Sequence, residues 1–224
     1  MAMILAGEVQ VDGQRAEKAG MPVAKDARIE IISRAQKFVS RGGVKLEGAL
    51  EDFAIDPGGR VCLDIGASNG GFTDCLLQHG AARVYAVDVN VEQLDWKLRQ
   101  NPRVIPIERN ARELRAKDLP EAVDLLVMDV SFISVRKVMA PAANLAKSSA
   151  DLLILIKPQF ELRREDIAHG GIVEDQKLHG QAIQSVREFV ESLGLDCLGV
   201  RASRLLGAEG NQEYFLHARK KALE

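Results

Sequence analysis

Five apolar segments separated by stretches of helical character dominate the chain from Arg60 onward. The segments are VCLDI (61–65), RVYAVDV (83–89), RVIPI (103–107), VDLLVMDV (123–130) and LLILI (152–156). Helical patterns lie between and after them, near 70–78, 91–99, 135–147 and 177–193. Strands that alternate with helices predict a parallel, doubly wound α/β sheet with helices on both faces. The unbroken aliphatic run 152–156 is typical of a strand that is covered on both sides.

The end of the chain follows a different pattern. LDCLGVRAS (195–203) and EYFLHAR (213–219) are two strand-like segments whose connection shows no helix. Without a crossover helix, they should pair antiparallel. A mostly parallel seven-stranded sheet closed by an antiparallel last strand is typical of the Rossmann-like class I methyltransferases and less so of dinucleotide-binding dehydrogenases.

A small β module is expected before this sheet. Residues 7–32 are short β-like pieces broken by glycine and proline, and Asp12-Gly13 is a strong signal for a tight hairpin turn. We therefore expect a module over residues 1–34, a basic linker over 35–43 and the α/β domain over 44–224, whose first helix runs from about Val44 to Phe53.

The composition is that of an ordinary globular protein and excludes few functions. The 224 residues carry a net charge of −2, and no apolar run approaches the ~20 residues of a membrane helix. No export signal and no CxxC pair is visible, so we expect a cytoplasmic protein with reduced cysteines and no metal site. Locally, however, Arg34, Lys37, Arg41 and Lys45 fall within twelve residues that contain no acid. A solvated face and contacts to RNA phosphates both explain such a cluster.

The segment VCLDIGASNGGFTDCLL is a strand, a glycine turn and a helix, and three interpretations compete for it. The dinucleotide fingerprint is weakened because Ser68 replaces the glycine that approaches a pyrophosphate. The hydrolase nucleophile elbow also matches GASNG, but none of the four histidines follows a strand in a suitable context. An S-adenosylmethionine loop needs no middle glycine, and Asp88 at the end of the next strand suits the two ribose hydroxyls.

Four charged residues are expected at the edge of the sheet that carries this loop. Asp129 ends the fourth strand, Lys157 ends the fifth, and Glu213 opens the last, antiparallel strand. The carboxyl ends of parallel strands are where open α/β sheets bind ligands. Lys45 lies on the helix that leads into the sheet. Taken singly, each residue is equally well a surface or ion-pair residue, and Lys157 a side chain that extends to solvent from the sheet edge.

Taken together, the motifs resemble the TlyA-type (haemolysin A) family. The similarity lies in SRGGVKLEGAL, CLDIGASNGGFTDCLL, VYAVDVN, MDVSFIS, LILIKPQFE, GGIVED and GNQEYF. The resemblance implies an S-adenosylmethionine-dependent 2′-O-methyltransferase of ribosomal RNA, with cytidine targets, related to FtsJ-like ribose methyltransferases. It also implies an S4-type RNA-binding module, of which residues 1–34 resemble a part that lacks the first helix or two.

By this resemblance, the catalytic Lys-Asp-Lys-Glu tetrad falls on Lys45, Asp129, Lys157 and Glu213. The residues expected to bind the cofactor are Asp64, Gly66, Ala67, Ser68, Gly70, Gly71, Phe72, Thr73, Asp88, Asn110 and Asp129. Those expected to contact RNA phosphates are Arg34, Lys37, Arg41, Arg163 and Arg164. The partners expected are ribosomal RNA or ribosomal subunits.

The tetrad also makes chemical sense, because a ribose 2′-hydroxyl is a poor nucleophile until it loses its proton. A lysine accepts that proton if burial or a neighbouring positive charge favours its neutral form, and Lys157 is the candidate base. Lys45 supplies such a charge, whereas the two carboxylates act in the opposite direction, so the balance stays open. Two other functions compete with this one: a membrane-lytic haemolysin, which the lack of an amphipathic basic helix disfavours, and an RNA-binding module without catalytic activity.

Overall fold

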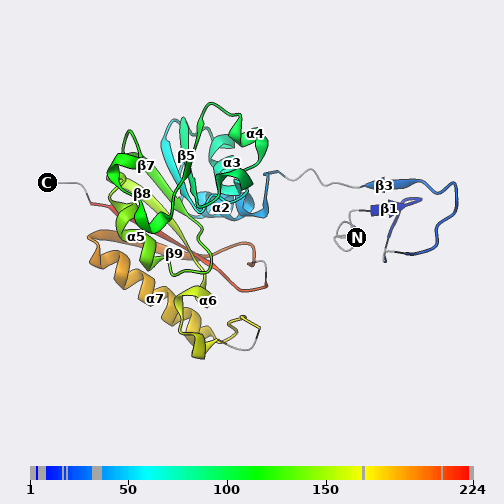
Figure 1. The fold of residues 1–224 in the computed structure, drawn as a ribbon. Helices are drawn as coiled ribbons and strands as arrows, with labels where there is room; N and C mark the ends of the chain where they lie inside the picture. Colours follow the sequence, from blue (N-terminus) through cyan, green and yellow to red (C-terminus); the bar gives the residue numbers. More distant parts are fainter. Residues whose placement is uncertain are drawn as a thin grey trace. The chain divides into compact units, whose positions relative to one another are not determined.

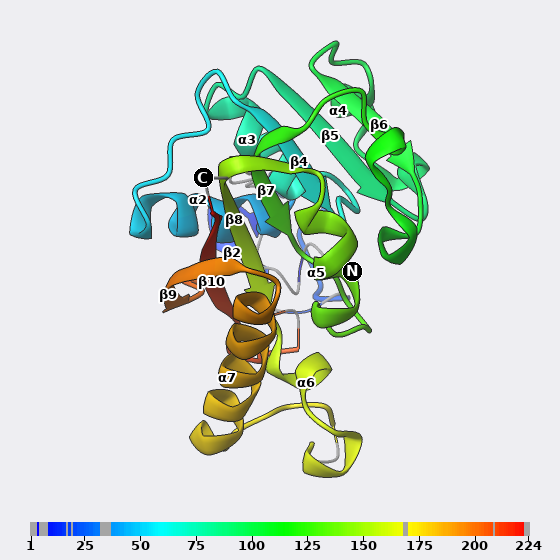
Figure 2. The same ribbon diagram turned by 90° about the vertical axis from the view of Figure 1, so that its left-hand side faces the viewer.

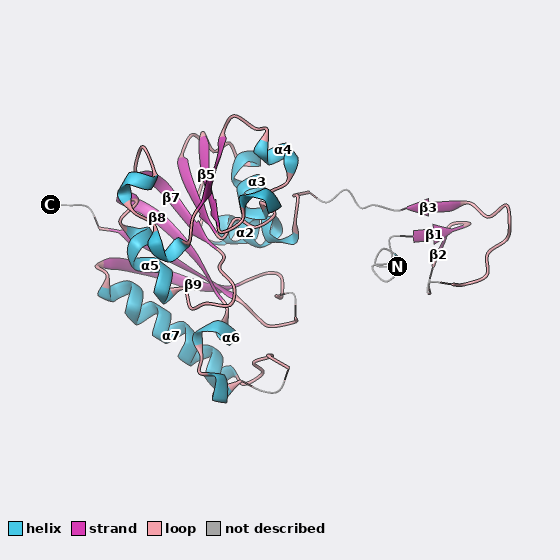
Figure 3. Ribbon diagram, in the orientation of Figure 1, coloured by secondary structure: helices cyan, strands magenta, loops and turns pink. Residues whose placement is uncertain are grey.

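The chain divides into two compact units, Met1–Lys37 and Phe38–Glu224, in a computed structural model (Figure 1). The structure describes residues 4, 9–16, 18, 20–31, 37–167, 170–207 and 209–221. Figure 3 shows that the first unit contributes short strands, whereas the second combines a large sheet with helices. The expectation of a small β module before an α/β domain agrees with this division, but its S4-like character stays a prediction.

The first unit contains a small three-stranded antiparallel sheet. Strands β1 (Val9–Val11), β2 (Gln14–Arg15) and β3 (Ile29–Ile31) lie in the order β2-β1-β3. The β1–β2 turn is the expected Asp-Gly hairpin, with φ of 50° at Asp12 and 79° at Gly13. Positive φ at both turn residues matches the twist of the flanking strands. Asp12 also accepts a hydrogen bond from the Arg28 amide at 2.9 Å, which fixes the turn against β3.

The second unit is built on a seven-stranded sheet. Its strands are β4 (Val61–Ile65), β5 (Arg83–Asp88), β6 (Val104–Glu108), β7 (Val123–Met128), β8 (Ala146–Ile156), β9 (Leu195–Ala202) and β10 (Tyr214–Lys220). They lie in the order β6-β5-β4-β7-β8-β10-β9. The first five are parallel, and β10 pairs antiparallel with both β8 and β9. The predicted fold class, a doubly wound sheet with an antiparallel closing strand, is therefore confirmed.

Helices cover both faces of the sheet (Figures 1 and 2). Those on one face are α2 (Arg41–Asp52), α3 (Gly71–Gln78) and α4 (Trp96–Arg99), and those on the other are α5 (Arg136–Ala143) and α7 (Gln176–Ser192). Each face has its own buried apolar cluster, one centred on Leu46, Leu76 and Phe215, the other on Leu126, Met139 and Val186. Short elements complete the unit: η1 (Val91–Gln93), η2 (Ala111–Glu113), η3 (Ala116–Asp118), α6 (Pro158–Glu161) and η4 (Arg164–Asp166).

The boundaries of three expected helices were wrong. The first helix begins at Arg41 instead of Val44, so Arg41 and Lys45 share one helix. The stretch 91–99 is split into η1, which ends at Gln93, and α4, which Asp95 caps by accepting from the Lys97 amide. The stretch 135–147 ends as a helix at Ala143, since the chain from Ala146 pairs with β7 and starts β8.

The register of the sheet aligns the strand ends that carry the predicted site. Gly66 follows β4 and Asp129 follows β7, and the amide of Asp129 donates to the carbonyl of Ile65 at 2.9 Å. On the other side of β8, Tyr214 pairs with Ile156. Because this pair is antiparallel, Glu213 lies just before β10 at the edge where Lys157 lies just after β8. One rim of the sheet therefore carries the residues predicted from separate parts of the sequence.

Neither a membrane span nor a metal cluster is found among the described residues. None of the described helices is both long and apolar enough to cross a membrane. Within the same ranges, no group of three or more His, Cys, Asp or Glu side chains could hold a metal ion.

A buried carboxylate with three hydrogen-bond donors stabilises the opposite end of the sheet. Asp151 is 5 % exposed and accepts hydrogen bonds from Arg60 at 2.8 Å, His217 at 2.9 Å and Arg219 at 2.7 Å. Burial favours the protonated carboxyl, but hydrogen bonds from these three partners outweigh it and lower the pKa of Asp151. The carboxylate thus connects β4, β8 and β10.

Replacing this carboxylate should destabilise the fold without touching the strand ends. We expect Asp151→Ala to lower the free energy of unfolding by about 3 kcal/mol, because it leaves two arginines and a histidine without their shared partner. Urea denaturation measures this. Asp196→Ala is the matched control, since Asp196 is 55 % exposed in its ion pair with Lys221 and should cost less than about 1 kcal/mol. Equal losses for the two variants would contradict the structural role of Asp151.

Candidate active site

Two adjoining cavities open at the carboxyl ends of the parallel strands. The smaller, of about 190 Å³, is lined by Ser40, Arg41, Gly42, Lys45, Gly66, Ala67, Ser68, Gly71, Phe72 and Asp129. The larger, of about 370 Å³, is lined by Gly66, Ser68, Val87, Asp88, Val89, Arg109, Asn110, Ala111, Arg112, Asp129, Val130, Ser131, Phe132, Ile133 and Val138. Gly66, Ser68 and Asp129 line both cavities, which therefore meet at the glycine loop and the end of β7.

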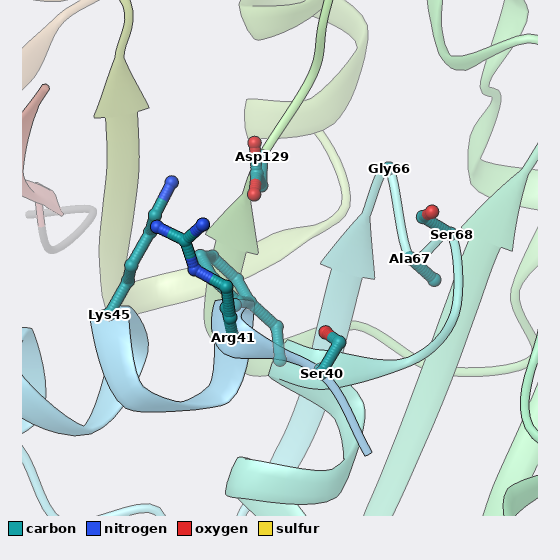
Figure 4. A pocket seen from close by; sticks show the side chains of 10 residues that line it. Ser40, Arg41, Lys45, Gly66, Ala67, Ser68 and Asp129 are labelled. Carbon is teal, nitrogen blue, oxygen red and sulfur yellow. The ribbon is translucent and has the colours of Figure 1, made fainter. Parts of the chain in front are cut away.

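The four tetrad residues form two close ion pairs, in which Lys45 lines the smaller cavity and Asp129 lines both. Their partners, Glu213 and Lys157, are not among the residues that line either cavity. Lys45 lies 2.5 Å from Glu213, and Lys157 lies 2.6 Å from Asp129, measured from Nζ to a carboxylate oxygen. Both lysines are 8 % exposed and Glu213 is 3 % exposed. In Figure 4, the side chains of Arg41 and Lys45 extend from α2 toward Asp129, and the turn from Gly66 to Ser68 lies across from them. The structure thus brings together two ammonium groups and two carboxylates that lie far apart in the sequence.

Two residues of the segment MDVSFIS were not singled out from the sequence. Ser131 accepts a hydrogen bond from Lys157 at 2.7 Å and lines the larger cavity. Phe132 lines the same cavity with a side chain that is 90 % exposed and a backbone φ of 64°. Its ring lies 5.4 Å from that of Phe160, whose ring centroid is 6.0 Å from the Lys157 nitrogen. A serine or phenylalanine in a loop gives no pattern of its own, so only the fold reveals them.

The backbone path of the loop after β4 requires glycine at two positions, Gly66 and Gly71. Gly66 has a φ of 83°, and a Cβ there would overlap the carbonyl oxygen of Asp129. A Cβ at Gly71 would overlap the hydroxyl of Ser40. The Ser68 amide donates to Asp88 at 2.9 Å, while the Ser68 hydroxyl donates to Asn69 at 3.4 Å. The loop is therefore held close to the ends of β5 and β7, with its backbone facing the cavities.

The residues predicted to bind a cofactor do not all line a cavity. Asp64 and Thr73 are fully buried beneath the loop, where the Thr73 hydroxyl donates to Asp64 at 2.6 Å. Gly70 lies against the side chains of Leu94 and Leu98 instead. Burial raises the pKa of Asp64 to about 7, against the hydrogen bond from Thr73, and the charge of Asp129 raises it further. One oxygen of Asp64 has no hydrogen-bond partner among the described residues.

Asp88, the acidic residue at the end of β5, has different partners from Asp64. Asp88 lines the larger cavity, and its two oxygens accept backbone amides from Ser68 and Asn90, at 2.9 and 3.1 Å. Each carboxylate oxygen keeps a lone pair for a further donor. Asn110 lies two residues beyond β6 and caps η2 by accepting from the Arg112 amide at 3.1 Å. An acid beside an apolar wall of Val89, Ala111 and Ile133 suits a ribose attached to a flat base.

The cations predicted to contact RNA are placed unevenly. Arg34 lies outside the described residues, and Lys37 ends the first unit with an exposed side chain. Arg41 lines the smaller cavity and donates to the Leu206 carbonyl at 3.1 Å. Arg163 and Arg164 are exposed beyond α6, and Arg163 pairs with Glu165 at 3.5 Å.

The fold and the cavities at its strand ends define a class I methyltransferase. The FtsJ-like methyltransferase family matches residues 38–220. The chain is 44% identical over 219 residues to the "16S/23S rRNA (cytidine-2'-O)-methyltransferase TlyA" of Mycobacterium tuberculosis, covering 97% of this chain and 82% of that protein. It is 40% identical to "Hemolysin A" of Brachyspira hyodysenteriae, with 96% and 90% covered. A candidate haemolysin from Streptococcus thermophilus, 36% identical, superposes with a TM-score of 0.85 over 98% of this chain and 81% of that one.

The chain therefore belongs to the FtsJ-like methyltransferase family and, within it, to the TlyA-type (haemolysin A) group. The resemblance read from the motifs is confirmed, as is the prediction of an enzyme that uses S-adenosylmethionine. The roles of the individual site residues stay predictions.

The raised pKa of Asp64 predicts a pH-dependent stability. The protonated Asp64 contributes to the free energy of unfolding. This contribution is fully present below pH 3.8 and is lost as the pH rises through about 7, because the ionised carboxylate is buried without full compensation. We expect Asp64→Asn, which cannot ionise, to gain stability relative to the wild type as the pH rises from about 4 to about 7, by up to about 1.4 kcal/mol per pH unit, and to gain no more above that range. Urea denaturation at several pH values measures this. The exposed Asp56→Asn is the control, and parallel profiles for wild type and Asp64→Asn would contradict the prediction.

Proposed function

We propose that this protein transfers a methyl group from S-adenosylmethionine to the ribose 2′-hydroxyl of a cytidine in ribosomal RNA, in the cytoplasm. The observation that supports this most strongly is the distance of 2.6 Å between Lys157 and Asp129, the carboxylate that lines both cavities. A relative that is 44% identical over nearly the whole chain is named as an rRNA (cytidine-2'-O)-methyltransferase. The proposed substrate is that of the relative.

The two cavities fit the cofactor chemically. Asp88 and Asn110, with the apolar wall of the larger cavity, suit its adenosine, since a carboxylate can accept hydrogen bonds from both ribose hydroxyls. The backbone of Gly66–Ser68 and the first turn of α3 suit its amino-acid portion. Asp64 and Thr73 support the loop from below rather than touch the ligand. When bound, S-adenosylmethionine supplies an electrophilic methyl group on a sulfonium cation.

In this proposal Lys157 accepts the proton of the ribose 2′-hydroxyl. Its side chain is buried at the end of the apolar strand β8, and Asp129 orients its nitrogen. Lys45 lines the smaller cavity and is oriented by Glu213. Its positive charge provides a contact for the phosphate that flanks the target ribose. The two carboxylates fix both nitrogens so that the acceptor oxygen meets the base in one orientation.

The RNA would be bound by exposed cations and an exposed ring. Arg163 and Arg164 lie on the segment that follows α6, and Arg41 lies at the smaller cavity. Phe132, which is 90 % exposed at the larger cavity, offers a face on which an unpaired base can stack. Ribosomal RNA or a ribosomal subunit is the partner, with the first unit as a further RNA-binding element.

Removing the proposed base should abolish methyl transfer while leaving cofactor binding intact. We expect Lys157→Ala to lower kcat by at least about 100-fold, because general-base catalysis contributes about 10²–10⁴-fold. Radiolabel transfer from S-adenosylmethionine to ribosomal RNA measures kcat, and calorimetry measures cofactor affinity. Lys147→Ala is the matched control, since Lys147 pairs with Asp124 at the opposite end of the sheet and is 46 % exposed. Transfer that survives Lys157→Ala would remove this lysine from the mechanism.

Removing the exposed arginines should weaken RNA binding and leave the cofactor site unchanged. For Arg163→Ala with Arg164→Ala, we expect weaker binding to ribosomal subunits and a salt dependence that is shallower by about one unit for each phosphate the variant can no longer neutralise. Binding isotherms at several salt concentrations test this. Arg187→Ala is the control, because Arg187 pairs with Glu191 along α7. An unchanged salt slope in the double variant would show that these arginines do not bind phosphate.

A further inference from the structure

Lys157 has a second polar partner whose geometry bears on its proposed role as a base. Its nitrogen lies 2.6 Å from a carboxylate oxygen of Asp129 and donates to the hydroxyl of Ser131 at 2.7 Å. The ring of Phe160 lies near the same nitrogen, with its centroid at 6.0 Å. Ser131 follows Asp129 by two residues, so one loop carries both polar partners of the lysine.

Ser131 is the partner that makes a hydrogen bond with the lysine nitrogen among the described residues, because the Asp129 oxygen at 2.6 Å is close but lacks hydrogen-bond geometry. An ammonium group carries three N–H donors, and a neutral amine carries two and a lone pair. In either form, the hydrogen bond to Ser131 fixes the direction of one N–H and thereby the orientation of the nitrogen. A carboxylate in place of Ser131 would instead favour the ammonium form. Ser131 thus orients the nitrogen without adding a negative charge.

The loop that carries Ser131 is also tied to the segment that carries Lys157. Glu161 is 6 % exposed in α6 and accepts hydrogen bonds from the Ser134 hydroxyl at 2.6 Å and the Val135 amide at 2.8 Å. Arg136 donates to the Glu161 carbonyl at 3.2 Å. The loop after β7 and the segment after β8 are therefore joined at two places, once through Lys157 and once through Glu161. This second connection fixes the distance over which Ser131 meets the lysine.

We propose that Ser131 is a positioning residue for the reaction: its hydroxyl holds one N–H of Lys157 so that the nitrogen lone pair faces the acceptor ribose. This rests on the proposed function, in which Lys157 takes the proton of the 2′-hydroxyl. During that transfer the O–H bond breaks, a new N–H bond forms on Lys157, and the ribose oxygen uses the electron pair it keeps to bond to the methyl carbon. The carbon–sulfur bond of the methyl donor breaks at the same time, and its electron pair stays on sulfur. The Ser131 hydroxyl accepts from the lysine throughout and is not itself consumed.

The first test follows the titration of Lys157 in the full chain without cofactor or RNA. Lysine labelled with ¹³C at Cε is observed by NMR, and the Lys157 signal is assigned with Lys157→Arg. We expect Ser131→Ala to move the Lys157 titration to lower pH, because the ammonium loses an acceptor, while Lys45 titrates as before. Ser131→Thr keeps a hydroxyl and should restore the wild-type curve. Ser192→Ala, which removes a hydroxyl that bonds to the Phe189 carbonyl at the end of α7, should leave the curve unchanged.

The second test measures methyl transfer to ribosomal RNA over a range of alkaline and acidic pH. We expect Ser131→Ala to lower kcat by about 10- to 100-fold, the size of a small misplacement of a reacting group, with KM for RNA and cofactor affinity within about 3-fold. The acid limb of its pH–rate profile should move to lower pH, and Ser131→Thr should recover most of the rate. An unchanged titration of Lys157 together with an unchanged kcat would overturn the proposal, as would an effect confined to cofactor affinity or KM.

The two tests separate this inference from the proposed function. If the wild-type chain transfers methyl groups in a Lys157-dependent manner and Ser131→Ala behaves like the wild type, only the role of Ser131 fails. If Lys157→Ala is as active as the wild type, the proposed function fails, while the titration of Lys157 still reports whether Ser131 governs its proton.

Discussion

The pairing of β10 with β8 is the constraint on which the site depends. Tyr214 is opposite Ile156 in an antiparallel ladder, so the chain enters β10 at the same edge where it leaves β8. A parallel last strand would place Glu213 at the far end of the sheet. A shift of one residue would turn the side chains of β10 to the wrong faces and break both apolar clusters. The closing strand therefore serves the site as well as the core, because it supplies the partner of Lys45.

The charges at this edge balance, which explains how so many of them can be buried. Two lysines that are 8 % exposed are each within 2.6 Å of a carboxylate. Removing one member would leave an unpaired charge in a poorly solvated place, whereas an intact pair roughly offsets its own desolvation. Such pairs add little to stability, so their presence is better explained by the orientation they give to two nitrogen atoms. Asp64 shows the opposite case, since it is fully buried, accepts from the uncharged Thr73 and has a pKa raised to about 7 by burial.

The sequence predicted the strands, their order along the chain and the residues at their ends. These features can be recognised locally, because an apolar run marks each strand and the carboxyl ends of parallel strands lie at one edge of a sheet. Helix ends were less predictable, since pairing of Ala146 with β7 overrode a helical pattern. Cofactor residues were predicted from a contiguous motif, yet Asp64 and Thr73 lie beneath the loop and Gly70 lies against Leu94 and Leu98, so these three do not line the cavities. Ser131 and Phe132 carried no periodic or compositional signal, and they became visible only when the loop after β7 was placed against Lys157.

The structure also explains why the two lysines should have different tasks although both are buried and paired. Lys157 follows a strand in the middle of the sheet and precedes Pro158, so its backbone is fixed by the core and its nitrogen by one charged and one neutral partner. Lys45 lies one turn into α2, the helix that follows the basic segment, and its nitrogen meets the more buried carboxylate, Glu213. Both nitrogens have a carboxylate partner, so the two lysines differ in the second, uncharged partner of Lys157 and in its position at the end of a core strand. These two differences support assigning the base to the strand and the phosphate contact to the helix.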